Sequence, residues 1–137
     1  MEKLNVFRDK KGIEKVTLLM ILFTISLLMG CNNSISKGKK VDYIEVVKLS
    51  DNKKWTFLEK DEIDKFIKAL DDKEKFNGKF EIRTPDYSVD IYFKNKSKES
   101  YSLWLGEEDN IQGILMDENT IWYIDKKSNP TLRKLLS

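Results

Sequence analysis

Residues 87–93, with the sequence YSVDIYF, alternate between apolar and polar side chains almost without interruption. Successive side chains of a β-strand point to opposite faces of the sheet. The odd-numbered residues from Tyr87 to Phe93 therefore share one apolar face, whereas Tyr92 falls on the other face among polar neighbours. The stretch predicts a half-buried strand, and it requires other elements to cover its apolar side.

The same alternation recurs on both sides of this stretch, in short segments separated by turn-forming residues. Turns of about four residues join neighbouring strands in antiparallel order. Further strands are predicted at residues 41–49, 55–58, 80–84, 101–105, 111–116 and 120–124.

Two segments have the periodicity of helices. Apolar residues at positions 63, 66, 67 and 70 predict a central helix, with Asp61 as its N-cap, that frays over residues 71–75. Ser128 and Asn129 precede Pro130, which predicts a short C-terminal helix. The sequence therefore predicts an α+β fold in which one central and one C-terminal helix pack on an antiparallel β-meander of about six to seven strands.

The N-terminal segment differs from the rest of the chain. Residues 1–15 carry five cations and three anions, and fourteen uncharged, mostly apolar residues follow at 16–29. A helix of that length spans about 21 Å, which is shorter than the ~30 Å hydrocarbon core of a bilayer. A positive segment, a short apolar run and a small residue predict a secretory signal.

The end of this signal, Leu28-Met29-Gly30-Cys31, resembles the lipobox of bacterial lipoproteins, although Met29 is bulkier than is usual there. The resemblance implies cleavage after Gly30 and attachment of a diacylglycerol to Cys31, whose two acyl chains would anchor the protein stably. Two alternatives are an uncleaved membrane anchor over residues 16–35 and an unmodified thiol beside an ordinary signal. The anchored readings place the protein at the cell membrane, on its outer face.

These observations predict three regions: a lipoprotein signal peptide at 1–30, a flexible tether at 31–40 and a single globular domain at 41–137. Removal of residues 1–30 takes away five cations and three anions, which leaves 20 of each in the exported chain. Nucleic-acid binding needs a clustered basic surface. A neutral exported domain therefore gives no reason to expect a nucleic-acid partner.

Catalytic chemistry has few candidates, because the chain contains no histidine and one cysteine. A Ser-His-Asp triad, a Cys-His pair and a Cys/His zinc site each lack a required residue. Asp90 and Glu99, on neighbouring predicted strands, are one carboxylate pair for glycosidase chemistry, and the acidic turns at 107–109 and 117–118 are candidates for calcium. Without further signals, we expect no enzymatic activity, no catalytic residue, no metal site and no cofactor.

Aromatic residues are the most distinctive feature of the predicted exported chain. Trp104, Trp122 and Tyr92 fall on the side of the sheet opposite their apolar neighbours. Trp104 and Trp122 are either core residues under a helix or, with Tyr92, an exposed surface that binds a partner. Lysines gather at residues 37–40 and at the hairpin tip 94–98. We interpret the first group as solvated linker and the second as protection of a sheet edge, with contact to anionic lipid or wall phosphate as the alternative.

The strings RTPDYSVDIYF, YSLWL and WYI, together with the lipobox and the C-terminal leucines, resemble the YhfM-like small lipoproteins of Gram-positive bacteria. This resemblance implies an architecture and a location, but no mechanism. We therefore expect a membrane-anchored, non-enzymatic binding or accessory module that contacts an envelope protein or a wall polymer. The alternatives are a small-ligand or ion sensor and a cell-wall hydrolase.

Overall fold

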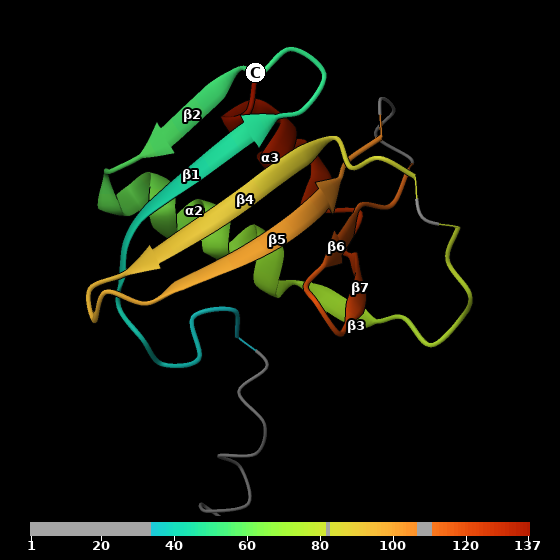
Figure 1. Ribbon diagram of the computed structural model, residues 1–137, viewed down its shortest axis with the longest axis horizontal. Helices are drawn as coiled ribbons and strands as arrows, with labels where there is room; N and C mark the ends of the chain where they lie inside the picture. Colours follow the sequence, from blue (N-terminus) through green and yellow to red (C-terminus); the bar gives the residue numbers. More distant parts are fainter. Residues whose placement is uncertain (1–33, 82, 107–110) are drawn as a thin grey trace, which may run out of the picture. The chain divides into compact units, whose positions relative to one another are not determined.

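A single antiparallel sheet of seven strands dominates the fold, in the order β2-β1-β4-β5-β6-β7-β3 (Figure 1). The structure is a computed structural model that describes residues 34–81, 83–106 and 111–137. The elements are β1 (Val41–Lys48), β2 (Lys54–Phe57), α2 (Lys60–Asp71), β3 (Lys73–Lys75), β4 (Tyr87–Phe93), β5 (Lys98–Trp104), β6 (Ile114–Met116), β7 (Ile121–Ile124) and α3 (Asn129–Leu135).

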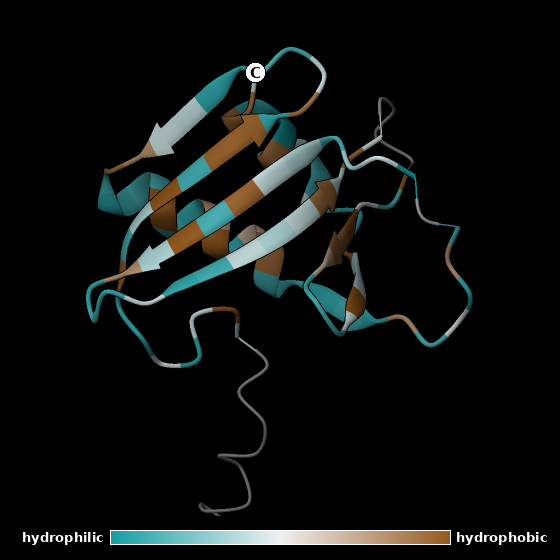
Figure 2. Cartoon of the chain, in the orientation of Figure 1, coloured by the Kyte–Doolittle hydropathy of each residue, from teal (hydrophilic) through white to brown (hydrophobic). Residues whose placement is uncertain are grey.

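Strand β4 contains the alternating sequence YSVDIYF and lies in the interior of the sheet. It pairs with β1 on one side, where Ile91 faces Ile44, and with β5 on the other, where Val89 faces Tyr101. Figure 2 shows the apolar and polar bands that alternate along these strands. The odd-numbered residues from Val89 to Phe93 are buried and Tyr92 is on the opposite face, which confirms the predicted strand and its orientation.

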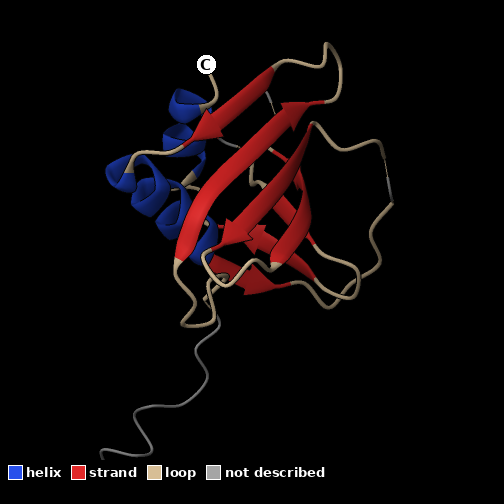
Figure 3. Cartoon of the chain, turned by 60° about the vertical axis from the view of Figure 1, so that its left-hand side comes forward, coloured by secondary structure: helices blue, strands red, loops and turns tan. Residues whose placement is uncertain are grey.

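Both helices lie on one face of the sheet (Figure 3). Helix α2 buries Ile63, Phe66, Ala69 and Leu70, and the Phe66 ring lies 5.3 Å from the ring of Phe57 in β2. This arrangement confirms the predicted α+β fold.

The beginning of α2 differs from the prediction. The N-cap residue is Glu59 in extended conformation, and its side chain makes no capping hydrogen bond. Asp61 lies inside the first turn with Glu62, where carboxylates interact favourably with the helix dipole. The N-cap lies two residues before the predicted one. Asp61 favours the start of the helix through its charge and not through a capping hydrogen bond.

The chain directly after α2 forms a strand, where the sequence predicted a fraying helix end. Strand β3 pairs with β7 in the register Lys73↔Ile124, Glu74↔Tyr123 and Lys75↔Trp122. Its charged sequence gives no strand signal by itself, because the pairing partner lies about fifty residues later in the chain.

Residues 76–81 and 83–86 form a loop over the second face of the sheet, so the predicted strand at 80–84 is wrong. The ring of Phe76 lies 4.8 Å from that of Tyr123, and the ring of Phe80 lies 5.6 Å from that of Trp104. The Trp104 indole donates a hydrogen bond to the Arg83 carbonyl at 3.2 Å. The loop therefore covers the β5–β7 half of the face that the helices leave open.

Residues 34–40 pack against the domain, in contrast to the predicted flexible tether. Ile35 is 2% exposed and belongs to the hydrophobic core. The Asp71 carboxylate at the end of α2 accepts a hydrogen bond from the Ile35 amide at 2.6 Å and another from the Ser34 hydroxyl at 2.8 Å. The buried isoleucine is the physical reason for the difference, since the surrounding sequence is polar.

Helix α3 begins after Ser128, as predicted, but Ser128 makes no side-chain capping bond. Asn129 is fully buried and donates a hydrogen bond from its side-chain amide to the Ile111 carbonyl. Leu132 and Leu136 enter the core. Asn129 therefore ties α3 to the chain before β6 instead of capping its own helix.

Candidate functional site

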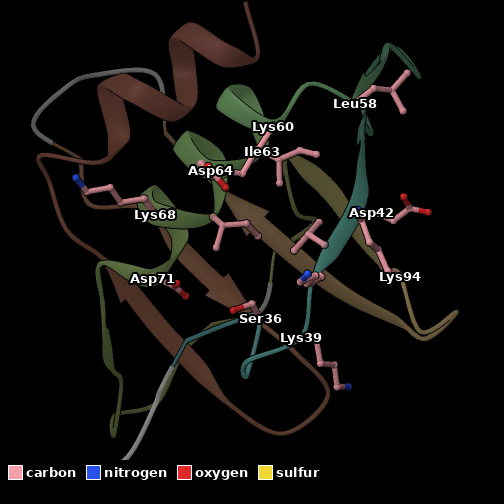
Figure 4. Close-up of a pocket in the computed structure, with 13 residues that line it drawn as sticks. Ser36, Lys39, Asp42, Leu58, Lys60, Ile63, Asp64, Lys68, Asp71 and Lys94 are labelled. Carbon is pink, nitrogen blue, oxygen red and sulfur yellow. Dashed lines mark ion pairs between the residues drawn. The ribbon is translucent and has the colours of Figure 1, made fainter.

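A groove of about 740 Å³ lies beside α2, at the end of the domain where the described chain begins (Figure 4). Its walls come from α2, from the chain just before and within β1, from Leu58 and from the hairpin residue Lys94. The lining residues are Ser36, Lys39, Lys40, Val41, Asp42, Leu58, Lys60, Ile63, Asp64, Ile67, Lys68, Asp71 and Lys94.

The groove exists because the chain segment at residues 34–40 is held against the end of α2. Asp71 binds the Ser34 hydroxyl and the Ile35 amide, and its Oδ1 also lies 3.6 Å from the Lys73 ammonium. The Lys94 amide donates to the Lys40 carbonyl at 2.9 Å, which joins the segment to the β4–β5 hairpin. Two separate elements therefore position the N-terminal wall.

The lining combines apolar side chains with charges of both signs. Val41, Ile63 and Ile67 supply apolar surface, and Leu58 is 68% exposed, the highest value among the large exposed hydrophobic residues. Five lysines, three aspartates and Ser36 complete the lining, and Lys60 pairs with Asp64 at 3.8 Å. Such a surface suits an amphipathic ligand whose apolar part lies along α2 and whose charged groups meet the rim.

Hydroxyl groups are scarce in the groove. Among the described residues that line it, Ser36 carries the sole hydroxyl, which lies 2.9 Å from the Ser34 hydroxyl. Activation of a serine nucleophile requires an adjacent general base. The chain has no histidine to serve that role.

Tyr92 lies on the face of the sheet that carries no helix, in a cross-strand pair with Tyr43. Their rings are stacked 4.3 Å apart, and the Lys98 ammonium lies 5.8 Å from the centre of the Tyr92 ring. Both tyrosines are half-buried. Of the three aromatic residues selected from the sequence, Tyr92 has this open position on the helix-free face.

Trp104 lies on the same face but is 2% exposed. The loop that carries Phe80 and Arg83 covers it, so it offers no accessible surface to a partner. The sequence left two readings, core under a helix or exposed patch; Trp104 is buried, but not under a helix. The cover is a loop, which the alternation of side chains does not reveal.

Trp122 is half-buried and packs at the edge of the core. The Lys73 ammonium lies 5.5 Å from the centre of its ring, and burial lowers the pKa of Lys73 although Asp71 opposes the shift. Trp104, Trp122 and Tyr92 therefore lie in three different environments and do not form one surface.

The carboxylate pair Asp90 and Glu99 is divided between the two faces of the sheet. Asp90 faces Ser100, whose hydroxyl donates to it at 2.6 Å, whereas Glu99 faces Ile91 and accepts a hydrogen bond from the Tyr101 hydroxyl at 2.7 Å. Two carboxylates on opposite faces cannot flank one glycosidic bond, so this pair offers no glycosidase site.

The predicted calcium candidates divide in a similar way. Residues 107–109 lie outside the described residues, and the Asp117 carboxylate accepts the amides of Asn119 and Thr120 in a turn. Within residues 34–81, 83–106 and 111–137, no group of three or more acidic or cysteine side chains gathers to hold a metal ion.

The predicted lipidation site Cys31 and its neighbours Leu28, Met29 and Gly30 lie outside the described residues. In the part of the chain that the structure describes, no helix has the length and apolar character needed to cross a membrane.

The groove was missed by the sequence reasoning. The sequence shows only that Ile67 and Leu58 are apolar, and the structure adds that neither is fully buried. The approach of residues 34–40 to α2 had no sequence signal other than Ile35, a single apolar residue in a polar segment.

Comparison with known proteins gives one family and one fold. A family model described as "YhfM protein" matches residues 37–137. No curated protein matches the chain. The structure is similar to the crystal structure of a thioesterase-like protein from Clostridium sporogenes, with a TM-score of 0.52 and 11% sequence identity over 69% of this chain and 93% of the other. At that identity the likeness concerns the fold alone.

Proposed function

The chain belongs to the YhfM family over residues 37–137, and the name of that family describes no activity. We propose, from the groove, that this protein is a lipid-anchored binding module on the outer face of the cell membrane. The module carries no catalytic machinery of its own. The groove beside α2 takes an amphipathic segment of an envelope protein or wall component, and Cys31 holds the domain at the membrane.

The groove carries this proposal. Leu58 is exposed at its margin and extends the apolar surface that Val41, Ile63 and Ile67 supply, and contiguous apolar surface rimmed by polar residues marks interaction sites. The surrounding lysines and aspartates provide specificity, since a charged rim excludes partners of the wrong charge pattern.

The fold likeness to a thioesterase-like protein does not supply a competing activity. A fold hosts many functions, and a catalytic assignment needs a site. The lining of the groove provides one hydroxyl, that of Ser36, and the Asp71 carboxylate is hydrogen-bonded to the neighbouring Ser34 hydroxyl.

Site-specific photo-crosslinking in intact cells tests the groove. A photoreactive residue at Leu58 is compared with one at Leu49, a second exposed leucine that lies just beyond the other end of β1. We expect a specific crosslinked product at Leu58 that is absent at Leu49. Equal products at the two positions, or none at Leu58, would contradict a partner in the groove.

The anchor is tested separately, by labelling cells with a palmitate analogue. We expect the label on the chain and its loss in Cys31→Ser, together with release of the domain from the membrane fraction. An unlabelled, membrane-free wild-type protein would contradict the anchored location.

A further inference from the structure

Two groups of lysines that are far apart in the sequence meet at one end of the sheet. Val41 at the start of β1 pairs with Phe93 at the end of β4, and Lys48 at the other end of β1 pairs with Tyr87. The chain before β1 and the β4–β5 hairpin therefore share one end, which we call the basic end. Its exposed lysines are Lys37, Lys39, Lys40, Lys94, Lys96 and Lys98.

Acidic side chains neutralise the basic end only in part. Glu99 lies 3.5 Å from the Lys37 ammonium and 3.8 Å from that of Lys39, and Asp90 lies 4.0 Å from that of Lys98. Three more carboxylates line the groove beside this end: Asp64 pairs with Lys60 and Asp71 with Lys73, and Asp42 lies at the start of β1. With Asp64 and Asp71 paired to lysines outside this group, Asp42, Asp90 and Glu99 stand against the six ammonium groups of the basic end, whereas residues 31–137 are neutral as a whole.

The packing of Ile35 limits how far this end can lie from Cys31. Only Asn32, Asn33 and Ser34 separate the cysteine from the buried isoleucine. An extended chain covers at most about 3.6 Å per residue, so the two residues are at most about 14 Å apart. The ten-residue tether expected from the sequence would have allowed the domain to stand well away from the membrane.

We propose that the basic end rests on the anionic phospholipid headgroups of the membrane to which Cys31 is anchored. This inference rests on the proposed lipid anchor and adds an orientation to it. Electrostatic attraction to a charged bilayer decays over a Debye length of about 8 Å at physiological salt, and the connection of at most about 14 Å keeps Ile35 within about two such lengths of the anchored cysteine. The groove, which Lys39, Lys40 and Lys94 also line, then opens beside the membrane surface.

The test uses the full chain, acylated at Cys31, in vesicles of phosphatidylcholine with or without phosphatidylglycerol. A fluorophore is placed on Ser97→Cys in the β4–β5 hairpin or on Ser50→Cys in the β1–β2 turn at the opposite end, and a quencher is attached to the lipid headgroups. With phosphatidylglycerol we expect at least about twofold stronger quenching at position 97 than at position 50, and loss of the difference at ~1 M salt, where the Debye length is about 3 Å.

Matched charge variants locate the effect. Lys94→Gln with Lys96→Asn should abolish the preference for position 97, whereas Lys48→Gln with Lys53→Gln at the opposite end should preserve it. Asn replaces Lys96 because the backbone at position 96 has a φ of 71°, a left-handed conformation in which asparagine is enriched. Thermal unfolding of each variant verifies that the fold is intact.

The outcomes separate the orientation from the anchor. Anchored protein with equal quenching in both kinds of vesicle, or a preference that persists without Lys94 and Lys96, overturns the orientation alone. If the chain isolated from cells instead carries a free Cys31 thiol and does not remain with vesicles, both proposals are overturned. Binding of soluble polyphosphate without any response to phosphatidylglycerol also overturns the lipid assignment.

Discussion

The two faces of the sheet are closed in different ways. On the helix-covered face, α2 and α3 bury a continuous core that includes Phe66 and Leu132, both with no exposed surface. On the opposite face, a loop covers Trp104 in the β5–β7 half, and the Tyr43–Tyr92 pair lies open in the β1–β4 half. The comparison teaches that side-chain alternation assigns a residue to a face, whereas its exposure depends on what crosses that face.

The largest effect is expected in the helix-covered core. Phe66→Ala removes a fully buried ring that contacts Phe57 and should lower the free energy of unfolding by about 3–5 kcal/mol. Urea denaturation measures the change, with Lys65→Ala on the exposed side of α2 as the control, expected within about 0.5 kcal/mol of wild type. A loss below about 1 kcal/mol would show that α2 does not close this face.

The next effect concerns the N-terminal segment. Ile35→Ala should cost about 2–4 kcal/mol, because the side chain is buried in the core. Leu58→Ala is the matched control, because Leu58 is exposed and its loss should cost less than about 0.5 kcal/mol. Equal, small effects for both variants would show that residues 34–40 form the flexible tether that the sequence predicted. The limit on the distance between Cys31 and the basic end would then no longer hold.

The third prediction concerns alkaline pH. Burial, and then the hydrogen bond to Glu99, raise the pKa of Tyr101 well above its ordinary value of about 10. Above pH ~10 the unfolded tyrosine releases its proton while the folded one retains it, so stability falls by up to about 1.4 kcal/mol per pH unit. Burial raises the pKa of Tyr87 as well, in the same direction.

Urea denaturation at pH 9 and pH 11 should therefore show a smaller alkaline loss for Tyr101→Phe than for wild type. The lowered pKa of Lys73 acts in the opposite direction, since stability then rises with pH towards the ordinary lysine value. This contribution is the same in both proteins and cancels in the comparison. Identical slopes would exclude Tyr101 as a source of the loss.

The smallest effect is expected on the open part of the sheet. Tyr92→Ala should cost about 1 kcal/mol or less, because the ring is half-buried and stacks on a single partner, Tyr43. A double-mutant cycle with Tyr43→Ala should give a coupling of about 0.5–1.5 kcal/mol. A loss as large as that of Phe66→Ala would show that the two faces are equally closed.

Much of the fold was predictable because its signals are local. The alternation in residues 87–93 placed β4 with the correct face inward, and the spacing of Ile63, Phe66 and Leu70 placed the buried side of α2. The errors occur where pairing or packing is distant in the chain. Strand β3 depends on β7, and the loop that replaced the strand predicted at 80–84 is held by Trp104.

The candidate site was less predictable than the fold. Tyr92 was assigned to the correct face, but the groove requires residues 36–42, Leu58, α2 and Lys94 to meet, and no local pattern encodes that meeting. In the sequence, the lysines of the basic end appear as two separate groups, and nothing in the sequence indicates that the two groups are close in space.

The sequence by itself determined the periodic elements, the neutral charge of residues 31–137 and the lack of histidine, because these follow from neighbouring residues and from counting. Tertiary structure alone decided that Ile35 is buried, that Trp104 is covered and that Lys40 lies beside Lys94. These properties depend on contacts between segments distant in the chain, and such contacts are set by how the whole core packs.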